Sequence, residues 1–132
     1  MIVIDASALV AALLQTSAAE AVRRHLFAPN QSLHAPHLLD VEVAHVLRRY
    51  TLSRELDEER GRGALGALAD FPIRRYAHDL LLPRVWQLRD NFSAYDGVYV
   101  ALAEALGASL LTCDRRLASA ADQYVSIALI TV

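Results

Sequence analysis

The spacing of apolar and polar residues predicts strands and helices that alternate along the chain. Residues 1–5 form a short apolar run ending in an acid, typical of a buried strand, and residues 6–14 carry leucine and valine at helical spacing. Further helices are predicted over 17–27, 37–52, 57–69, 79–90, 95–106 and 115–121. Further strands are predicted over 32–35, 71–76, 109–113 and 124–132. This alternation predicts an α/β sandwich around a mostly parallel sheet.

Length and composition indicate one domain over residues 1–132. The chain is 55% hydrophobic and 21% charged, and it contains no repeat, low-complexity tract or linker. A single cysteine, Cys113, cannot form an internal disulfide, which favours a reducing, cytoplasmic location. The longest nearly uncharged run, residues 98–111, contains Glu104 and is too short to cross a bilayer, so a membrane protein is not expected.

The overall charge does not indicate a strongly basic nucleic-acid binder. The formal net charge is −2, and all 13 basic residues are arginine. A local patch is still compatible with this balance. Arg115 and Arg116 directly follow Asp114, so this pair is the best placed to contact a phosphate, although solvated arginines on a helix surface explain it equally well.

Four acidic residues are candidates for a catalytic or metal-binding site. Asp5 and Asp114 each follow a predicted strand, and parallel strands bring their carboxyl ends to one edge of a sheet, where ligands bind. Asp96 lies in the first turn of a predicted helix, and Glu42 lies within another, beside its apolar stripe. If these carboxylates share one cleft, their repulsion favours a bound divalent cation such as Mg²⁺ or Mn²⁺.

Structural roles account for several of these acids as well. Asp5 and Asp114 precede helices and can cap them, and residues 93–96 have the spacing of a capping box that includes Asp96. Glu42 has a weaker alternative in surface contacts with His45 or Arg49 on the same helix. Spacing alone leaves both interpretations open.

Four segments, taken together, are similar to a known family. They occur in the family's order across almost the whole chain and read MIVIDASAL from Met1, P-x5-EVAHVL from Pro36, SAYDGVYVALA from Ser93 and LLTCDRRL from Leu110. In these segments the chain resembles the PIN-domain ribonucleases, and among them the VapC-type toxins of bacterial toxin–antitoxin pairs. The fold implied by this resemblance is a three-layer sandwich with a central, mostly parallel sheet flanked by helices.

The resemblance also implies a function. Asp5, Glu42, Asp96 and Asp114 would form an acidic site for Mg²⁺, with Mn²⁺ as a substitute, and the enzyme would cut RNA, commonly tRNA or ribosomal RNA, and inhibit translation. Ser7 and Thr112 match hydroxyl positions beside the site, expected to hydrogen-bond ligands or metal-bound water. Homodimers and neutralisation by a cognate antitoxin are implied too. The chain has His45 where the family often has asparagine, and we expect His45 to be a bystander.

Two other functions compete with this hypothesis. A different Mg²⁺-dependent phosphohydrolase acting on a small ester is disfavoured because no second aspartate follows Asp5 in a DxD pattern. An RNA- or partner-binding module without catalysis would use the acids only as caps.

Several residues outside the acids are expected to serve packing or partner contact. Gly61, Gly63 and Gly66 weaken the helix over 57–69, and either they admit a partner helix such as the antitoxin or that helix is simply weak. Trp86 and the tyrosines Tyr76 and Tyr124 are expected to pack in the core or at its rim.

Overall fold

The central feature of the fold is a five-stranded sheet. In the computed structural model, which describes residues 1–131, the strands are β1 (Ile2–Ile4), β2 (Leu33–Pro36), β3 (Ile73–Tyr76), β4 (Ser109–Thr112) and β5 (Ile127–Leu129). Their order across the sheet is β3-β2-β1-β4-β5, and each neighbouring pair is parallel. The last predicted strand extended to Val132, which lies outside the described residues. The expected α/β class with a parallel sheet is confirmed.

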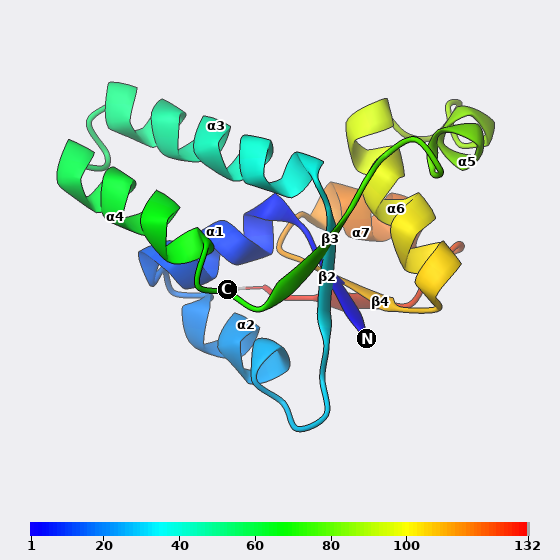
Figure 1. The fold of residues 1–132 in the computed structure, drawn as a ribbon, viewed down its shortest axis with the longest axis horizontal. Helices are drawn as coiled ribbons and strands as arrows, with labels where there is room; N and C mark the ends of the chain where they lie inside the picture. The colour runs from blue at the N-terminus through cyan, green and yellow to red at the C-terminus, as the bar shows by residue number, and fades with distance from the viewer. Residues whose placement is uncertain (132) are drawn as a thin grey trace.

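Helices cover both faces of the sheet. Figure 1 shows α1 (Ala6–Leu14), α2 (Ala19–Leu26), α3 (Leu38–Leu52) and α4 (Glu58–Leu68) on one side of the strands. The helices α5 (Leu82–Gln87) and α6 (Ala94–Leu106) lie on the other side, and α7 (Arg115–Ala121) joins β4 to β5. The three layers predicted from the family resemblance are therefore present.

Burial follows from this layering. Every residue of β1 and β2 is buried, and the interior of β4 is buried as well, because helices exclude water from both faces. On the other side of the sheet, α6 buries seven consecutive residues from Gly97 to Ala103. The central strands β1 and β4 therefore have rigid ends, and the residues that follow them are held in fixed positions.

Besides α4, whose predicted first residue Asp57 is its N-cap, three helices begin later than the sequence predicts. The predicted helix over 79–90 shrinks to Leu82–Gln87, since Pro83 is tolerated in a first helical turn but would clash with the preceding turn in a helix interior. Ser17 does not cap α2, which starts at Ala19 after Ala18 and has no side-chain cap. Pro36 closes β2 instead of opening α3, which starts at Leu38. All three differences concern element ends and leave the sheet unchanged.

The glycines of α4 divide into two kinds. A Cβ built on Gly61 would lie 3.1 Å from Oγ1 of Thr51, so a glycine there allows α4 to approach α3 closely. Gly63 and Gly66 have no neighbouring atom within 4 Å of such a Cβ. The packing predicted for a glycine of this helix thus occurs within the chain at Gly61, and the other two face open space.

The packing prediction for Trp86 is wrong. Its side chain is 68% exposed and lies under the guanidinium of Arg89, whose Cζ is 4.6 Å from the ring centroid. The short helix α5 buries only Val85, so it offers the tryptophan no interior face. Tyr76 and Tyr124 are half-buried, as expected for rim positions.

No helix within residues 1–131 combines the length and the apolar character needed to cross a membrane.

Candidate active site

The first candidate acid, Asp5, sits where β1 turns into α1. Its Oδ1 accepts hydrogen bonds from Oγ of Ser7 at 2.7 Å and from the backbone N–H of Ala8 at 3.0 Å. Its Oδ2 accepts one from Oγ1 of Thr112 at the end of β4. Asp5 is therefore both the N-cap of α1 and a carboxylate at the carboxyl edge of the sheet, so the two interpretations of this residue are compatible.

Ser7 and Thr112 hold the ends of β1 and β4 together. Each hydroxyl donates its hydrogen to Asp5 and accepts a backbone N–H, from Cys113 at 2.9 Å for Ser7 and from Asp114 at 2.9 Å for Thr112. A hydroxyl has one hydrogen, so these bonds orient Asp5 and use the donor capacity of both groups. The expected bonds from these hydroxyls to a ligand stay a prediction.

Asp114 follows β4 and caps α7. Its Oδ1 accepts the backbone N–H groups of Arg116 at 2.9 Å and Leu117 at 3.1 Å. Capping by Asp114 thus involves one carboxylate oxygen. Because β1 and β4 are adjacent and parallel, the acids that follow them lie at the same edge of the sheet.

Asp96 comes to the same region from α6. Oγ of Ser93 accepts the backbone N–H of Asp96 at 3.1 Å, so Ser93 is the N-cap of α6. The Asp96 carboxylate faces the guanidinium of Arg116, with Oδ2 3.9 Å from Nη2. Ser93 therefore caps α6 with its side chain, and the Asp96 carboxylate is not needed as a cap.

Glu42 is held by a buried tyrosine. Oη of Tyr99 donates a hydrogen bond of 2.7 Å to Oε1 of Glu42, and Tyr99 is only 2% exposed. The alternative partners expected for Glu42 from its own helix, His45 and Arg49, are not the ones it uses. Tyr99 follows Asp96 by three residues, the spacing that places two side chains on one helix face. This spacing is the sequence feature that could have identified Tyr99 as a residue of the site.

The electrostatics of Asp5 show crowding by another acid. Burial is the main reason that the pKa of Asp5 is raised, and the negative charge of Asp114 adds to the rise. The hydrogen bonds that Asp5 accepts favour the charged form and act in the opposite direction. Burial also raises the pKa of the Cys113 thiol, with a contribution from Asp5, which disfavours the thiolate.

Asp96 and Glu42 show the same crowding. Burial raises the pKa of Asp96, the charge of Asp114 raises it further, and Arg116 opposes the rise. Burial also raises the pKa of Glu42, against the hydrogen bond from Tyr99, and the charges of Asp96 and Asp5 add to it. The charge of Asp114 thus acts on Asp5 and Asp96, and the charges of Asp5 and Asp96 act on Glu42, which indicates that the four acids lie in one region.

The donor chemistry of this site fits a hard cation. Within residues 1–131, no three histidine, cysteine, aspartate or glutamate side chains are placed to hold a metal ion directly. Mg²⁺ keeps several of its water molecules and usually binds through one or two carboxylates, so it does not require three converging protein ligands. The carboxylate oxygens of the site suit such a hydrated ion, whose positive charge would relieve the repulsion between neighbouring acids.

The remaining predicted residues lie at the margin of the site. His45 is exposed on α3. Arg115 and Arg116 are exposed as well, and the side chain of Arg116 is 86% accessible despite its contact with Asp96. Such an exposed pair contributes little to stability, so the guanidinium is free to leave Asp96 for a phosphate.

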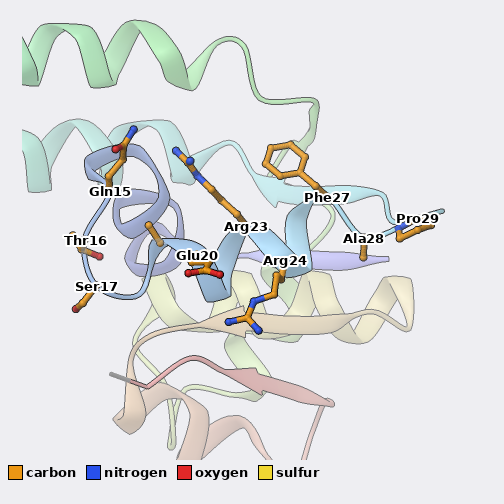
Figure 2. A pocket seen from close by; sticks show the side chains of 10 residues that line it. Gln15, Thr16, Ser17, Glu20, Arg23, Arg24, Phe27, Ala28 and Pro29 are labelled. Atoms are coloured by element: carbon orange, nitrogen blue, oxygen red, sulfur yellow. The ribbon is translucent and has the colours of Figure 1, made fainter.

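Three cavities help to define the surroundings. One of about 220 Å³ is lined by Asp96 and Arg116 together with residues of the α5–α6 turn and α7. Another, of about 370 Å³, includes Ser7 and Cys113. A wider hollow of about 780 Å³ runs along α2 between residues 15 and 29, and Figure 2 shows Arg23, Arg24 and exposed Phe27 around it. This hollow contains none of the four candidate acids.

Comparison with known proteins agrees with the fold and motifs. The family model of the PIN domain matches residues 2–123. The chain is 50% identical to Ribonuclease VapC1 of Mycobacterium tuberculosis over 119 residues, 89% of each chain. It is 43% identical to Ribonuclease VapC9 of the same organism over 130 residues, 98% of each chain.

A solved structure extends this similarity to three dimensions. The crystal structure of VapC20 from M. tuberculosis, described as a toxin that cleaves the sarcin–ricin loop, superposes with a TM-score of 0.71. The superposition covers 91% of this chain and 95% of VapC20, and at 14% identity it supports the fold alone. Together with the family model and the sequence relatives, these findings show that the chain belongs to the PIN domain family, among its VapC members.

Proposed function

We propose that this protein is an endoribonuclease of the toxin class, which hydrolyses RNA phosphodiester bonds and thereby inhibits translation. The observation that carries the proposal is that Asp5 and Asp114 follow adjacent parallel strands while the charge of Asp114 acts on Asp96 and the charges of Asp5 and Asp96 act on Glu42. The relatives named as ribonucleases support it, because they match the chain over nearly its full length. We further propose tRNA or ribosomal RNA as the substrate.

The activity is proposed to depend on Mg²⁺, with Mn²⁺ as a substitute. Asp5, Glu42, Asp96 and Asp114 would hold the cation. When bound, it would supply positive charge beside the phosphate and a water molecule of lowered pKa. The raised pKa values of Asp5, Glu42 and Asp96, caused mainly by burial and increased by neighbouring acids, support this, because a cation would offset the cost of their negative charges.

The chain's own side chains would prepare the site for the reaction. Two hydrogen bonds from the first turn of α1 and one from the end of β4 fix Asp5, and Tyr99 fixes Glu42, so neither carboxylate has to be reoriented when the substrate binds. Arg116, and Arg115 beside it, would bind a backbone phosphate, since guanidinium groups match phosphate oxygens in pairs. His45 is assigned no role, in keeping with its exposure.

The proposed partners are an antitoxin and a second copy of the chain. VapC-type toxins act in pairs with antitoxins, and the relatives of this chain carry that family name. We propose a cognate antitoxin as the inhibitor and a homodimer, or a hetero-oligomer with the antitoxin, as the assembly. A cytoplasmic location follows from this proposal, because the RNA substrates are there.

Cleavage of an RNA pool tests the proposal. Purified protein is incubated with total tRNA and ribosomal RNA in Mg²⁺, Mn²⁺ or EDTA, alongside Asp96→Asn and the control Asp79→Asn, which alters an exposed aspartate outside the site. We expect discrete fragments with either cation, from the wild type and the control only. Equal behaviour of wild type and Asp96→Asn, both folded, would favour a binding module that uses its acids as caps.

A further inference from the structure

The cavity beside Asp96 has a lining that the proposed hydrolysis does not explain. It lies between the α5–α6 turn and α7, has a volume of about 220 Å³, and is lined by Asn91, Phe92, Ser93, Asp96, Arg116, Leu117 and Ala120. Two of these residues belong to the acidic site and its arginine margin. A molecule in the cavity would therefore adjoin the position at which a phosphodiester is cut.

Part of the cavity wall is apolar. Phe92 is 8% exposed and Leu117 only 3%, and Ala120 adds a small apolar surface. The ring of Phe92 packs edge to face against Tyr124, with centroids 5.6 Å apart, which fixes its orientation. This part of the wall suits a group with apolar faces.

Polar groups also line the cavity. The side-chain amide of Asn91 donates one hydrogen bond of 3.0 Å to Oη of Tyr124, which leaves it a second N–H and a carbonyl oxygen. Oγ of Ser93 accepts the N–H of Asp96, so its own hydrogen can still be donated. The cavity thus offers both donors and acceptors beside the apolar part of its wall.

Size narrows the class of ligand. At about 30 Å³ for each water in the liquid, 220 Å³ corresponds to roughly seven water molecules. This is below the roughly 300–1,000 Å³ of sites for drug-sized ligands, and it suits one small planar ring system. A nucleobase has apolar faces and a polar edge, and proteins that read single-stranded RNA place unstacked bases in such settings.

We propose that this cavity binds one unpaired nucleobase next to the cleaved phosphodiester, with Asn91 and Ser93 contacting the polar edge of the base. The inference rests on the proposed ribonuclease function and adds a determinant of sequence preference to it. Arg116, at the same cavity, would hold a phosphate of the same nucleotide.

Two substitutions and a matched control test the subsite. Ala120→Leu fills the cavity, Asn91→Ala removes edge contacts, and Ser119→Leu adds the same side chain at an exposed neighbour on α7 outside the cavity. Cleavage rates are compared on oligoribonucleotides that vary in one base next to the cut. We expect a preference of about 10-fold or more in the wild type and in Ser119→Leu, and about 3-fold or less in both cavity variants. An unchanged preference in the cavity variants would overturn the subsite and leave the ribonuclease function standing.

A binding measurement separates the subsite from catalysis. Fluorescence anisotropy in EDTA measures the affinity for a labelled single-stranded RNA and for copies that lack one base at successive positions. We expect one missing base to weaken binding to the wild type about 10-fold or more, through lost stacking and edge contacts, and to leave the lower affinity of Ala120→Leu unchanged. Equal losses for both proteins would refute the subsite even if no RNA were cut. A wild type that shows the base dependence without cleaving RNA would refute the function instead.

Discussion

Replacing Tyr99 by phenylalanine tests whether a buried tyrosine positions Glu42. The substitution removes the phenolic hydroxyl, which donates a hydrogen bond of 2.7 Å to Oε1 of Glu42. The ring remains and keeps its packing, because Tyr99 is 2% exposed and phenylalanine fills nearly the same space. The loss is thus confined to the hydrogen bond.

The size of the effect follows from the surroundings of the two groups. A hydrogen bond to a charged group contributes about 1.5–3 kcal/mol, but Glu42 is half-buried and water would replace the phenol in part. We therefore expect a loss of about 1 kcal/mol in the free energy of unfolding, or roughly 3–5 °C in Tm. Cleavage should fall more, by about 10-fold to 100-fold, as when a partner that orients a metal ligand is removed.

Tyr76→Phe is the matched control. Oη of Tyr76 makes a hydrogen bond of the same length, 2.7 Å, to Nδ1 of His34, on β3 and β2 and outside the acidic site. Thermal unfolding and RNA cleavage are measured for both variants. Tyr76→Phe should lose stability while cutting RNA at the wild-type rate. Wild-type cleavage by Tyr99→Phe, or an equal loss of activity in both variants, would refute the positioning role.

Three further predictions concern stability. Burial and the charge of Asp114 raise the pKa of Asp96 above its ordinary 3.8, so the free energy of unfolding falls as pH rises through that raised value. Asp96→Asn should therefore melt at a higher temperature than the wild type at pH 7 in EDTA. A lower melting temperature would contradict this. Burial lowers the pKa of His34 below 6.5, so the free energy of unfolding falls as pH falls through 6.5. The urea midpoint should therefore change less between pH 7.5 and pH 5.5 for His34→Gln than for the wild type. Gly63→Ala should stabilise the protein by about 1 kcal/mol, because alanine favours the helix α4. Gly61→Ala should gain less, because its Cβ would lie close to Thr51. Equal gains of the two variants in calorimetry would exclude the close contact between Gly61 and Thr51.

The position of the acids at the sheet edge could be predicted because it depends on local sequence and one general rule. Asp5 and Asp114 each end a short apolar run, and parallel strands place such residues at the same edge. The sequence offered capping and site chemistry as alternatives for these residues. The structure shows that Asp5 caps α1 with Oδ1 while Oδ2 faces β4, so a single carboxylate serves both purposes.

The hydrogen bond between Tyr99 and Glu42 could not be predicted, because the two residues lie 57 positions apart in the chain on different helices. Contacts of this kind depend on how α3 and α6 meet beside the sheet, which the periodicity of either helix does not determine. The exposure of Trp86 has a similar origin. It depends on how the six-residue helix α5, which buries only Val85, packs against its neighbours.

Direct measurement of Mn²⁺ binding tests the central claim that the four carboxylates form one cation site. The electron paramagnetic resonance signal of free Mn²⁺ reports binding to the wild type, to Asp96→Asn, to Asp114→Asn and to the control Asp79→Asn. We expect the wild type and the control to bind Mn²⁺ alike and both site variants to bind it about 10-fold or more weakly. Site variants that are folded and bind Mn²⁺ as tightly as the wild type would contradict the claim.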